Sequence, residues 1–314
     1  MNILLSLAGL AVAVLVALIL LDRLFPETAA RLGIRLERRL SGLYEYSVAI
    51  PGFHIPYLQG GEGAERETVV LIHGFGGDKD NFTRAARFLT PHYRVICPDL
   101  SGFGEASRDL SANYYMADQV ERVRAFLDQL GIQKAHFGGN SMGGFIAAQF
   151  SATYPERVAS LWLLDAAGTH ASHDTPVFRR YLETGESPLL VRKEADIAAL
   201  IKAAMHRPPF MPHSLRRTVA RRAVADYALH SRILPQLIAS PLMETQYRSL
   251  ATPCLIVWGE KDALLSPAGA ASFKALFTNS RVDMMPGIGH MPMLETPKLS
   301  AQRYLEFLRA LPDT

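Results

Sequence analysis

Apolar and polar positions divide the chain into three parts. Residues 3–21 form an apolar run, interrupted by Ser6 and Gly9, that is about as long as a bilayer core is thick. Residues 27–43 have helical periodicity, with leucines on one face and arginines on the adjoining face. The remainder alternates between short apolar runs, Gly-rich turns and amphipathic stretches, which predicts alternating strands and helices.

The first run predicts a transmembrane helix over residues 1–25 rather than a cleaved signal peptide. A signal peptide has a basic start and a small-residue cleavage site, whereas nothing basic precedes this run, and Asp22 and Arg23 follow it. The arginines that follow would place the rest of the chain on the cytoplasmic side by the positive-inside tendency, and a single span leaves that side open. These arginines are Arg23, Arg31, Arg35, Arg38 and Arg39.

Small residues recur every fourth position within the predicted span, at Gly9, Ala13 and Ala17. They lie on one helix face and permit two copies to pair closely in lipid, which would give a homodimer. The alternative is that alanine is simply common in apolar helices.

Residues 26–43 are predicted to form an amphipathic juxtamembrane helix. Its apolar face carries Leu32, Leu36 and Leu40. This pattern suits a helix at a membrane surface. It suits equally a helix packed on the globular part of the chain.

From residue 44 the chain predicts a mostly parallel α/β fold. Strands are expected at 44–50, 68–72, 93–98, 134–137, 158–164, 253–258 and 281–285, and helices include 116–130, 143–154, 268–276 and 298–308. Most of the strands are continuous apolar runs without alternation, as expected for a parallel sheet covered on both faces.

A helical insertion interrupts this pattern between two predicted strands. Helical periodicity dominates residues 169–247, so we expect a helical cap there, inserted into a catalytic domain formed by 44–168 and 248–314.

Apolar side chains of the predicted cap are candidates for contacting a substrate. They are Leu189 and, in the stiff turn 208–212, Phe210 and Met211. The cap also carries a group of arginines that would either attract anionic lipid head groups or form an ordinary solvated face. This group is Arg216, Arg217, Arg221 and Arg222.

Composition excludes several classes of protein. A chain of 314 residues with 49% hydrophobic and 20% charged residues can fill one large core. A formal net charge of +3 without a recognisable reading module argues against nucleic-acid binding. The ten histidines show no zinc-binding spacing, so neither a metal ion nor another cofactor is predicted. Cys97 and Cys254 fall in predicted buried strands and are expected to be packed thiols.

Candidate chemistry begins at residues 139–143, Gly-Asn-Ser-Met-Gly, which fit the pattern G-x-S-x-G between a predicted strand and a predicted helix. The small residues Gly139 and Gly143 let the backbone turn sharply there, so that Ser141 projects above the sheet. Serine at its normal pKa is a poor nucleophile, so it needs a base and a third group that orients the base.

His290 and Asp262 fit these two roles, because each lies in a loop just beyond one of the last two predicted strands. The chain order Ser, Asp, His accompanies this kind of turn. The pattern therefore predicts Ser141 as nucleophile, His290 as general base and Asp262 as the orienting acid. Asp165, which ends the run 158–164, is an alternative position for the acid.

An acyl transfer also needs hydrogen-bond donors for the oxyanion, and backbone amides are well suited to this. The amide of Met142, directly after the nucleophile, is one candidate. The glycines of His73-Gly74-Phe75-Gly76-Gly77 let a second amide, that of Phe75, approach the substrate, which Gly74 would also touch. His73 is expected to brace this loop. A phosphate-binding loop is excluded, because G-x-x-x-x-G-K-[ST] is absent.

These motifs resemble those of the bacterial family V lipases. The resemblance rests on residues 73–82, 139–144, 258–262 and 208–212, and it covers about residues 44–310. Monoacylglycerol lipases of the α/β-hydrolase-domain type are more distant relatives. With the N-terminal run included, the chain is most similar to membrane-anchored bacterial phospholipases A1. The resemblance implies an α/β-hydrolase fold, a single-pass anchor in the bacterial inner membrane, membrane glycerophospholipids as substrates and fatty acids as products.

Three other functions fit parts of the pattern. A monoacylglycerol or lysophospholipid lipase, or a short-chain esterase, would use the same residues. Carbon-carbon hydrolases of dienoic ring-cleavage products share a similar Asn-Ser-Met-Gly-Gly turn, but they usually have a Gly-Pro-Gly loop that is absent here. A non-enzymatic lipid receptor on this fold would tend to lose a member of the Ser-Asp-His set, and all three are present.

Overall fold

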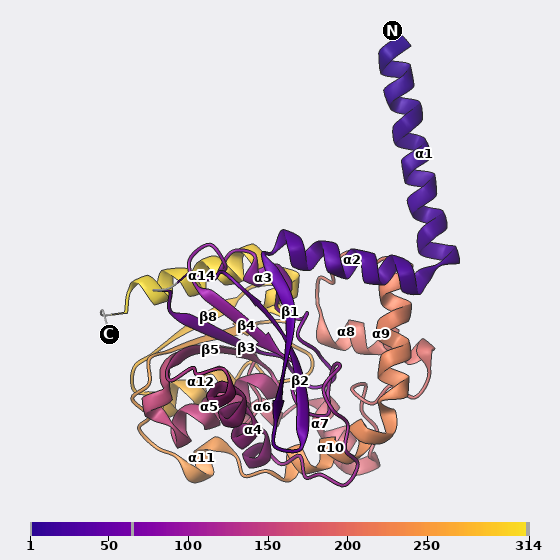
Figure 1. The fold of residues 1–314 in the computed structure, drawn as a ribbon. Helices are drawn as coiled ribbons and strands as arrows, with labels where there is room; N and C mark the ends of the chain where they lie inside the picture. The colour runs from indigo at the N-terminus through magenta and orange to yellow at the C-terminus, as the bar shows by residue number, and fades with distance from the viewer. Residues whose placement is uncertain (1, 64–65, 312–314) are drawn as a thin grey trace.

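The computed structural model describes residues 2–63 and 66–311, and one eight-stranded sheet organises their globular part (Figure 1). The sheet order is β1-β2-β4-β3-β5-β6-β7-β8. The strands are β1 Leu43–Ile50, β2 Phe53–Gly60, β3 Thr68–Ile72, β4 Arg94–Pro98, β5 Ala135–Asn140, β6 Val158–Leu164, β7 Cys254–Gly259 and β8 Ser280–Met285. Strand β2 pairs antiparallel with β1 and β4, and the other pairs are parallel.

Helices cover both sides of the sheet, which explains why its central strands have no polar face. Every residue of β3, β5 and β7 is buried. On one side the core includes α4 Met116–Gln129, α5 Met142–Thr153 and α12 Gly269–Leu276, and on the other α3 Thr83–Ala86, α13 Pro292–Glu295 and α14 Pro297–Arg309. Cys97 and Cys254 are buried free thiols, as predicted.

Strand β2 was not among the predicted strands, because Pro56 interrupts its apolar pattern. The structure accommodates this proline just outside the ladder between β2 and β4, which begins at the pair Tyr57 and Pro98. The missing N–H of Pro56 therefore leaves that ladder intact.

Between β6 and β7 the chain forms a series of helices (Figure 1). They are α6 His170–His173, α7 Pro176–Thr184, α8 Ile197–Ala204, α9 His213–Ala225, α10 Tyr227–Ala239 and α11 Met243–Gln246. A small apolar cluster around Val191, Ile197 and Ala220 packs α8 and α9 on one another. The body of the sheet and these helices together enclose the site described below.

The N-terminal arm consists of α1 Asn2–Leu24 and α2 Pro26–Leu40. Helix α1 stands away from the globular part, whereas α2 lies along it (Figure 1). Pro26 begins α2, and a proline disfavours helical backbone at the residue before it, which accounts for the break at Phe25. Among the residues described, no single helix reaches the length and apolar character of a membrane span, whereas Gly9–Leu24 and Pro26–Leu40 reach it as a pair bent by 117°.

Candidate active site

Ser141 lies at the tip of a strained turn between β5 and α5. Its φ of 56° and ψ of −119° fall in a region that residues other than glycine rarely adopt. A Cβ on Gly139 would lie 2.2 Å from the carbonyl oxygen of Gly143, and one on Gly143 would lie 2.2 Å from that of Ile72. Only glycine fits at both positions, as the sequence pattern predicted, and the turn presents Ser141 at the carboxyl end of the sheet.

Backbone and side-chain hydrogen bonds hold this turn in place. The amide of Ser141 donates to the carbonyl of Leu164 at 3.0 Å, which ties the turn to β6. Asn140 donates through Nδ2 to the carbonyl oxygen of His290 at 2.9 Å and to that of Leu164 at 3.1 Å. Sequence reasoning did not assign a role to Asn140, although its place inside the G-x-S-x-G turn was a usable signal.

His290 and Asp262 meet at the ends of β8 and β7. The distance between His290 Nδ1 and Asp262 Oδ2 is 2.7 Å, and both side chains are buried. The other oxygen, Asp262 Oδ1, accepts the amides of Leu264 at 2.8 Å and Leu265 at 3.0 Å. With Nδ1 bonded to the carboxylate, Nε2 of His290 is left as the acceptor that a general base needs.

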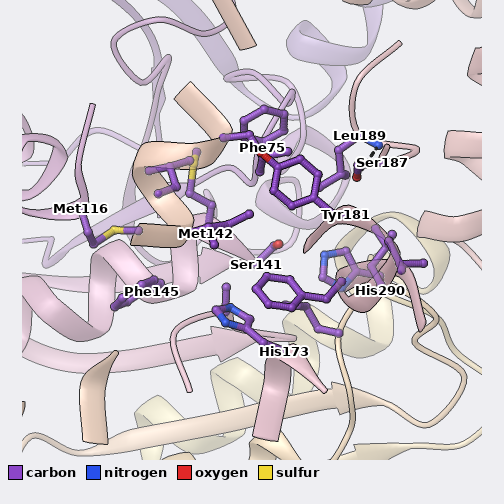
Figure 2. A pocket seen from close by; sticks show the side chains of 18 residues that line it. Phe75, Met116, Ser141, Met142, Phe145, His173, Tyr181, Ser187, Leu189 and His290 are labelled. Atoms are coloured by element: carbon purple, nitrogen blue, oxygen red, sulfur yellow. Dashed lines mark hydrogen bonds between the residues drawn. The ribbon is translucent and has the colours of Figure 1, made fainter. Parts of the chain in front are cut away.

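A cavity of about 100 Å³ joins the nucleophile and the base, and Figure 2 shows Ser141 and His290 among the side chains that line it. Most of the remaining lining is apolar, including Phe75, Met116, Met142, Phe145, Leu189 and Leu265. The polar exceptions are His173, Tyr181 and Ser187. A space of this character accepts a hydrocarbon chain beside a reactive ester.

The loop after β3 lies close to the nucleophile. A Cβ on Gly74 would lie 3.2 Å from Cβ of Ser141, so this position has little room for a side chain. The amide of Gly77 donates to the carbonyl of Gly74 at 3.1 Å, which closes a tight turn around Phe75. His73 braces the loop: its Nδ1 lies 2.8 Å from the carbonyl of Gly74, and its Nε2 accepts the amide of Leu100 at 3.0 Å.

A second cavity, of about 260 Å³, adjoins the first and shares Phe75, Leu189 and Leu264 with it. It is lined by Met211 of the 208–212 turn and reaches Ile34 of α2. The structure therefore brings Leu189 and Met211 to the site region. It does not bring Phe210 there, because that side chain is 84% exposed and lines neither cavity.

Asp165 provides a second buried carboxyl beside the pair. Its Oδ1 accepts the amide of Gly259 at 2.8 Å, whereas Oδ2 has no hydrogen-bond partner among the described residues. Burial, and then the negative charge of Asp262, raise the pKa of Asp165 well above its usual value. Asp165 is thus adjacent to the site, but the carboxyl that bonds to the His290 ring is that of Asp262.

Ligand atoms of Asp165, Asp262 and His290 lie within 4.8 Å of one another, a spacing that could suit a metal ion. The two Asp262 oxygens already accept hydrogen bonds from His290 and from two backbone amides. These contacts explain why the three side chains lie together: Asp262 is fixed by the backbone and in turn orients the ring of His290.

His173 contributes a polar but uncharged edge to the first cavity. Burial lowers the pKa of His173 to about 4, and its ring stacks on that of Phe178 with centroids 4.6 Å apart. His230 of α10 packs its ring on Phe75 at 5.1 Å, and burial lowers its pKa as well. Both rings are therefore neutral at physiological pH and contribute shape and hydrogen bonding rather than charge.

The chain is similar in sequence to a protein family and to several lipases. Residues 67–297 match the alpha/beta hydrolase fold family. Lipase 1 of Psychrobacter immobilis is 36% identical over 281 residues, which is 87% of each chain. A monoacylglycerol lipase of Mus musculus is 23% identical over 302 residues, covering 93% of this chain and 90% of the relative.

Solved structures give a similar result. The crystal structure of a membrane phospholipase A, described as a bacterial virulence factor, has a TM-score of 0.87 and 37% sequence identity and covers 98% of both chains. A dienoate hydrolase of a Rhodococcus species has a TM-score of 0.75 at 20% identity over 85% of this chain and 99% of that one, which indicates a shared fold alone. The relatives imply lipid substrates and a serine ester hydrolase. The chain belongs to the α/β-hydrolase fold family.

Proposed function

We propose that the protein is a membrane-associated phospholipase A1, which releases fatty acid from glycerophospholipids through an acyl-serine intermediate. The observation that carries this proposal is the apolar cavity in which Ser141 faces the His290 and Asp262 pair. An apolar space next to an activated serine favours esters with long acyl chains over small polar esters. The likeness to a membrane phospholipase A over 98% of both chains supports the phospholipid class.

Each catalytic step uses a group of this site. Ser141 Oγ attacks the ester carbonyl carbon while His290 Nε2 takes the hydroxyl proton, and Asp262 stabilises the resulting imidazolium. The amides of Phe75 and Met142 donate to the oxyanion. His290 then protonates the leaving alcohol oxygen, which breaks the ester bond and releases a lysophospholipid. Water activated by His290 hydrolyses the acyl-serine and releases the fatty acid.

Association with a bacterial inner membrane is part of the proposal. Apolar side chains of the arm are exposed at successive turns of both helices, including Leu10, Val14, Leu18, Leu32, Leu36 and Leu40. A bilayer would cover this surface, which is otherwise costly in water. The small-residue face of α1 at Gly9, Ala13 and Ala17 would remain accessible for pairing with a second copy of the chain.

Helices α6–α11 would act as a cap. Leu189, Leu234 and Leu237 from this segment line the first cavity above Ser141 and separate it from solvent. Excluding water strengthens electrostatic interactions at the reacting ester.

A monoacylglycerol lipase is the second candidate function. The first cavity has room for little more than part of one acyl chain, at about 100 Å³, and relatives named monoacylglycerol lipases align over more than nine-tenths of the chain. A substrate with a single chain needs less additional space at this site than a phospholipid with two.

The test is fatty-acid release by the full-length protein in detergent, with Ser141→Ala as control. Substrates are phospholipids labelled in either the sn-1 or the sn-2 chain, lysophospholipids and monoacylglycerols. We expect Ser141-dependent release of the sn-1 chain from intact phospholipid. Release from monoacylglycerol alone would replace the proposal by its alternative, and no Ser141-dependent release from any ester would reject both.

A further inference from the structure

Helix α2 of the N-terminal arm is fastened to the oxyanion loop, residues 73–82, by a two-point ion pair. Arg38 donates through Nε and Nη2 to the two carboxylate oxygens of Asp80, each at 2.7 Å. The two side chains are only 13% and 22% exposed. A planar guanidinium bound at two points fixes orientation as well as distance, so this contact defines where Asp80 lies relative to α2.

The same guanidinium joins the loop to the sheet. Arg38 Nη1 donates to Glu45 Oε2 of β1 at 2.8 Å, and the other Glu45 oxygen lies 3.3 Å from Lys79 Nζ. Lys79 is buried and donates to Asp99 at 3.0 Å and to Glu105 at 2.5 Å. Glu45 and Glu105 are 46% and 57% exposed, whereas Lys79 and Asp99 are buried, so it is the pair of Lys79 and Asp99 that holds the loop more tightly than an exposed ion pair would.

Few contacts separate Asp80 from the turn around Phe75, so a movement of Asp80 would also move this turn. Asn81 follows Asp80 directly, and a Cβ on Gly77 would lie only 2.6 Å from Asn81 Nδ2. The amide of Gly77 in turn closes the turn around Phe75 by donating to Gly74 at 3.1 Å. Although this segment borders the second cavity, it is tied together by hydrogen bonds: the amide of Asp78 donates to Asn81 Oδ1 at 3.2 Å, and the amide of Asn81 donates to the Asp78 carbonyl at 3.0 Å, so that a shift of Asp80 is passed along the segment.

We propose that Arg38 is a positioning residue for ester hydrolysis: by holding Asp80, it keeps the Phe75 amide where the oxyanion of the tetrahedral intermediate forms. The inference rests on the proposed function, because it takes Phe75 as an oxyanion donor. It gives a catalytic use to a helix that lies outside the matched family region of residues 67–297. The proposal thereby makes the rate of the reaction at Ser141 depend on the packing of α2 against the globular part.

Loss of this contact should affect the transition state rather than substrate binding. Removal of a whole oxyanion donor lowers kcat by about 10²-fold to 10³-fold in other hydrolases. A displaced donor costs less, so Arg38→Ala should lower kcat by about tenfold to a hundredfold while KM changes less than about threefold.

The experiment measures kcat and KM on a soluble short-chain p-nitrophenyl ester with the full-length protein in detergent. Arg39→Ala is the matched control, because Arg39 is the next residue of α2, is exposed, and has no recorded ion pair among the described residues. Arg38→Lys keeps the charge but loses the two-point geometry, and we expect an intermediate kcat. Arg38→Ala with Asp80→Asn removes both charges, and we expect it to stay as slow as Arg38→Ala.

Two results would overturn the inference while the proposed function stands: an Arg38→Ala enzyme as fast as Arg39→Ala, or recovery of wild-type kcat in the double variant. Recovery would mean that the unpaired Asp80 charge, and not the lost contact, slowed the enzyme. Failure of the proposed function is distinct, because wild-type protein would then show no Ser141-dependent turnover. If Arg38→Ala is unfolded at the assay temperature, the other two variants test the inference. Arg38→Lys with a kcat as high as that of Arg39→Ala, or wild-type kcat in the double variant, would then overturn it.

Discussion

The nucleophile turn and the helices that lie over it are held by different forces. In the turn and its neighbouring loops, main chain packs on main chain: a Cβ on Gly139, Gly143 or Gly259 would lie 2.0–2.2 Å from a carbonyl oxygen. The overlying helices are held mainly by side chains, although the amide of His290 also donates to the carbonyl of Ala204 in α8 at 3.1 Å. Arg222 of α9 pairs with Asp78 of the oxyanion loop, and Arg108 pairs with Asp226 at 2.9 Å.

This contrast separates the nucleophile turn, whose position is fixed, from the overlying helices, which can move. Main-chain packing at near contact leaves one arrangement, so the nucleophile, base and acid are preorganised before a substrate arrives. The side chains of these two pairs are between 6% and 38% exposed, and a contact between side chains can break by a change of rotamer without any movement of the main chain. Under the proposals above, the nucleophile turn and its neighbouring loops determine the reaction, and the cap and the arm regulate access and the placement of Phe75.

The largest effect should follow from Asp262→Asn. The two backbone amides that bond to Oδ1 keep the Asn oxygen at that position, so its NH2 group faces Nδ1 and donates to it. His290 would then carry its proton on Nε2, the wrong tautomer for a base, and kcat should fall by about 10⁴-fold as in a serine protease with the same change. Ester hydrolysis under saturating substrate measures this. Glu260→Gln, an exposed change two residues away, should leave kcat unaltered, and equal losses in both variants would contradict the assignment of Asp262.

Two glycine substitutions compare how tightly the nucleophile turn and the N-terminal arm are packed. Gly143→Ala places a Cβ 2.2 Å from the Ile72 carbonyl oxygen, and we expect a loss of several kcal/mol in the free energy of unfolding. Gly33→Ala, in α2, meets nothing within 4 Å and should stabilise its helix by up to about 1 kcal/mol. Denaturant unfolding of both variants checks this, and a well-folded Gly143→Ala protein would refute the account of the turn.

Chain-length selectivity should depend on Leu189 rather than on Phe210. Leu189 lines both cavities, so Leu189→Ala should remove about 1–3 kcal/mol of apolar contact and lower kcat/KM for long-chain esters by about tenfold or more. Short-chain esters should be affected less. Phe210 is 84% exposed, and Phe210→Ala should change kcat/KM by less than about twofold on either substrate. The reverse ranking would move the acyl site to the 208–212 turn.

Asp165→Asn, which imitates the neutral carboxyl that burial favours, should affect stability more than activity. The pKa of Asp165 is raised in the folded state, so the folded protein retains a proton that the unfolded chain loses above about pH 4. Wild type therefore loses stability relative to the variant as pH rises. We expect kcat within about threefold of wild type and a difference in Tm that grows from pH 5 to pH 8 in favour of Asp165→Asn.

Sequence alone predicted which of these side chains lie close together, because their placement depends on local backbone rules. Glycines spaced around Ser141 and the positions of Asp262 and His290 beyond strand ends follow from the turn and from a parallel sheet, and both are local signals. The link between Asn140 and His290 joins residues 150 apart in sequence, and no local pattern encodes it.

Elements that depend on tertiary contacts were not predicted. The antiparallel strand β2 was missed because Pro56 broke its pattern, although its neighbours tolerate the proline. Phe210 and Met211 adjoin in one apolar turn, and only the fold decides that Met211 faces a cavity while Phe210 faces out. The Arg38 and Asp80 pair joins residues 42 apart in sequence, and no local pattern linked them.

The most direct test of the central claim is to treat full-length protein with a fluorophosphonate, which reacts with activated serines, and to locate the adduct by peptide mass spectrometry. The account predicts one adduct, on Ser141, that is absent in Ser141→Ala and strongly reduced in His290→Ala although that variant keeps its fold. A folded wild-type protein that carries no adduct on Ser141, or carries it on another serine, would contradict the account.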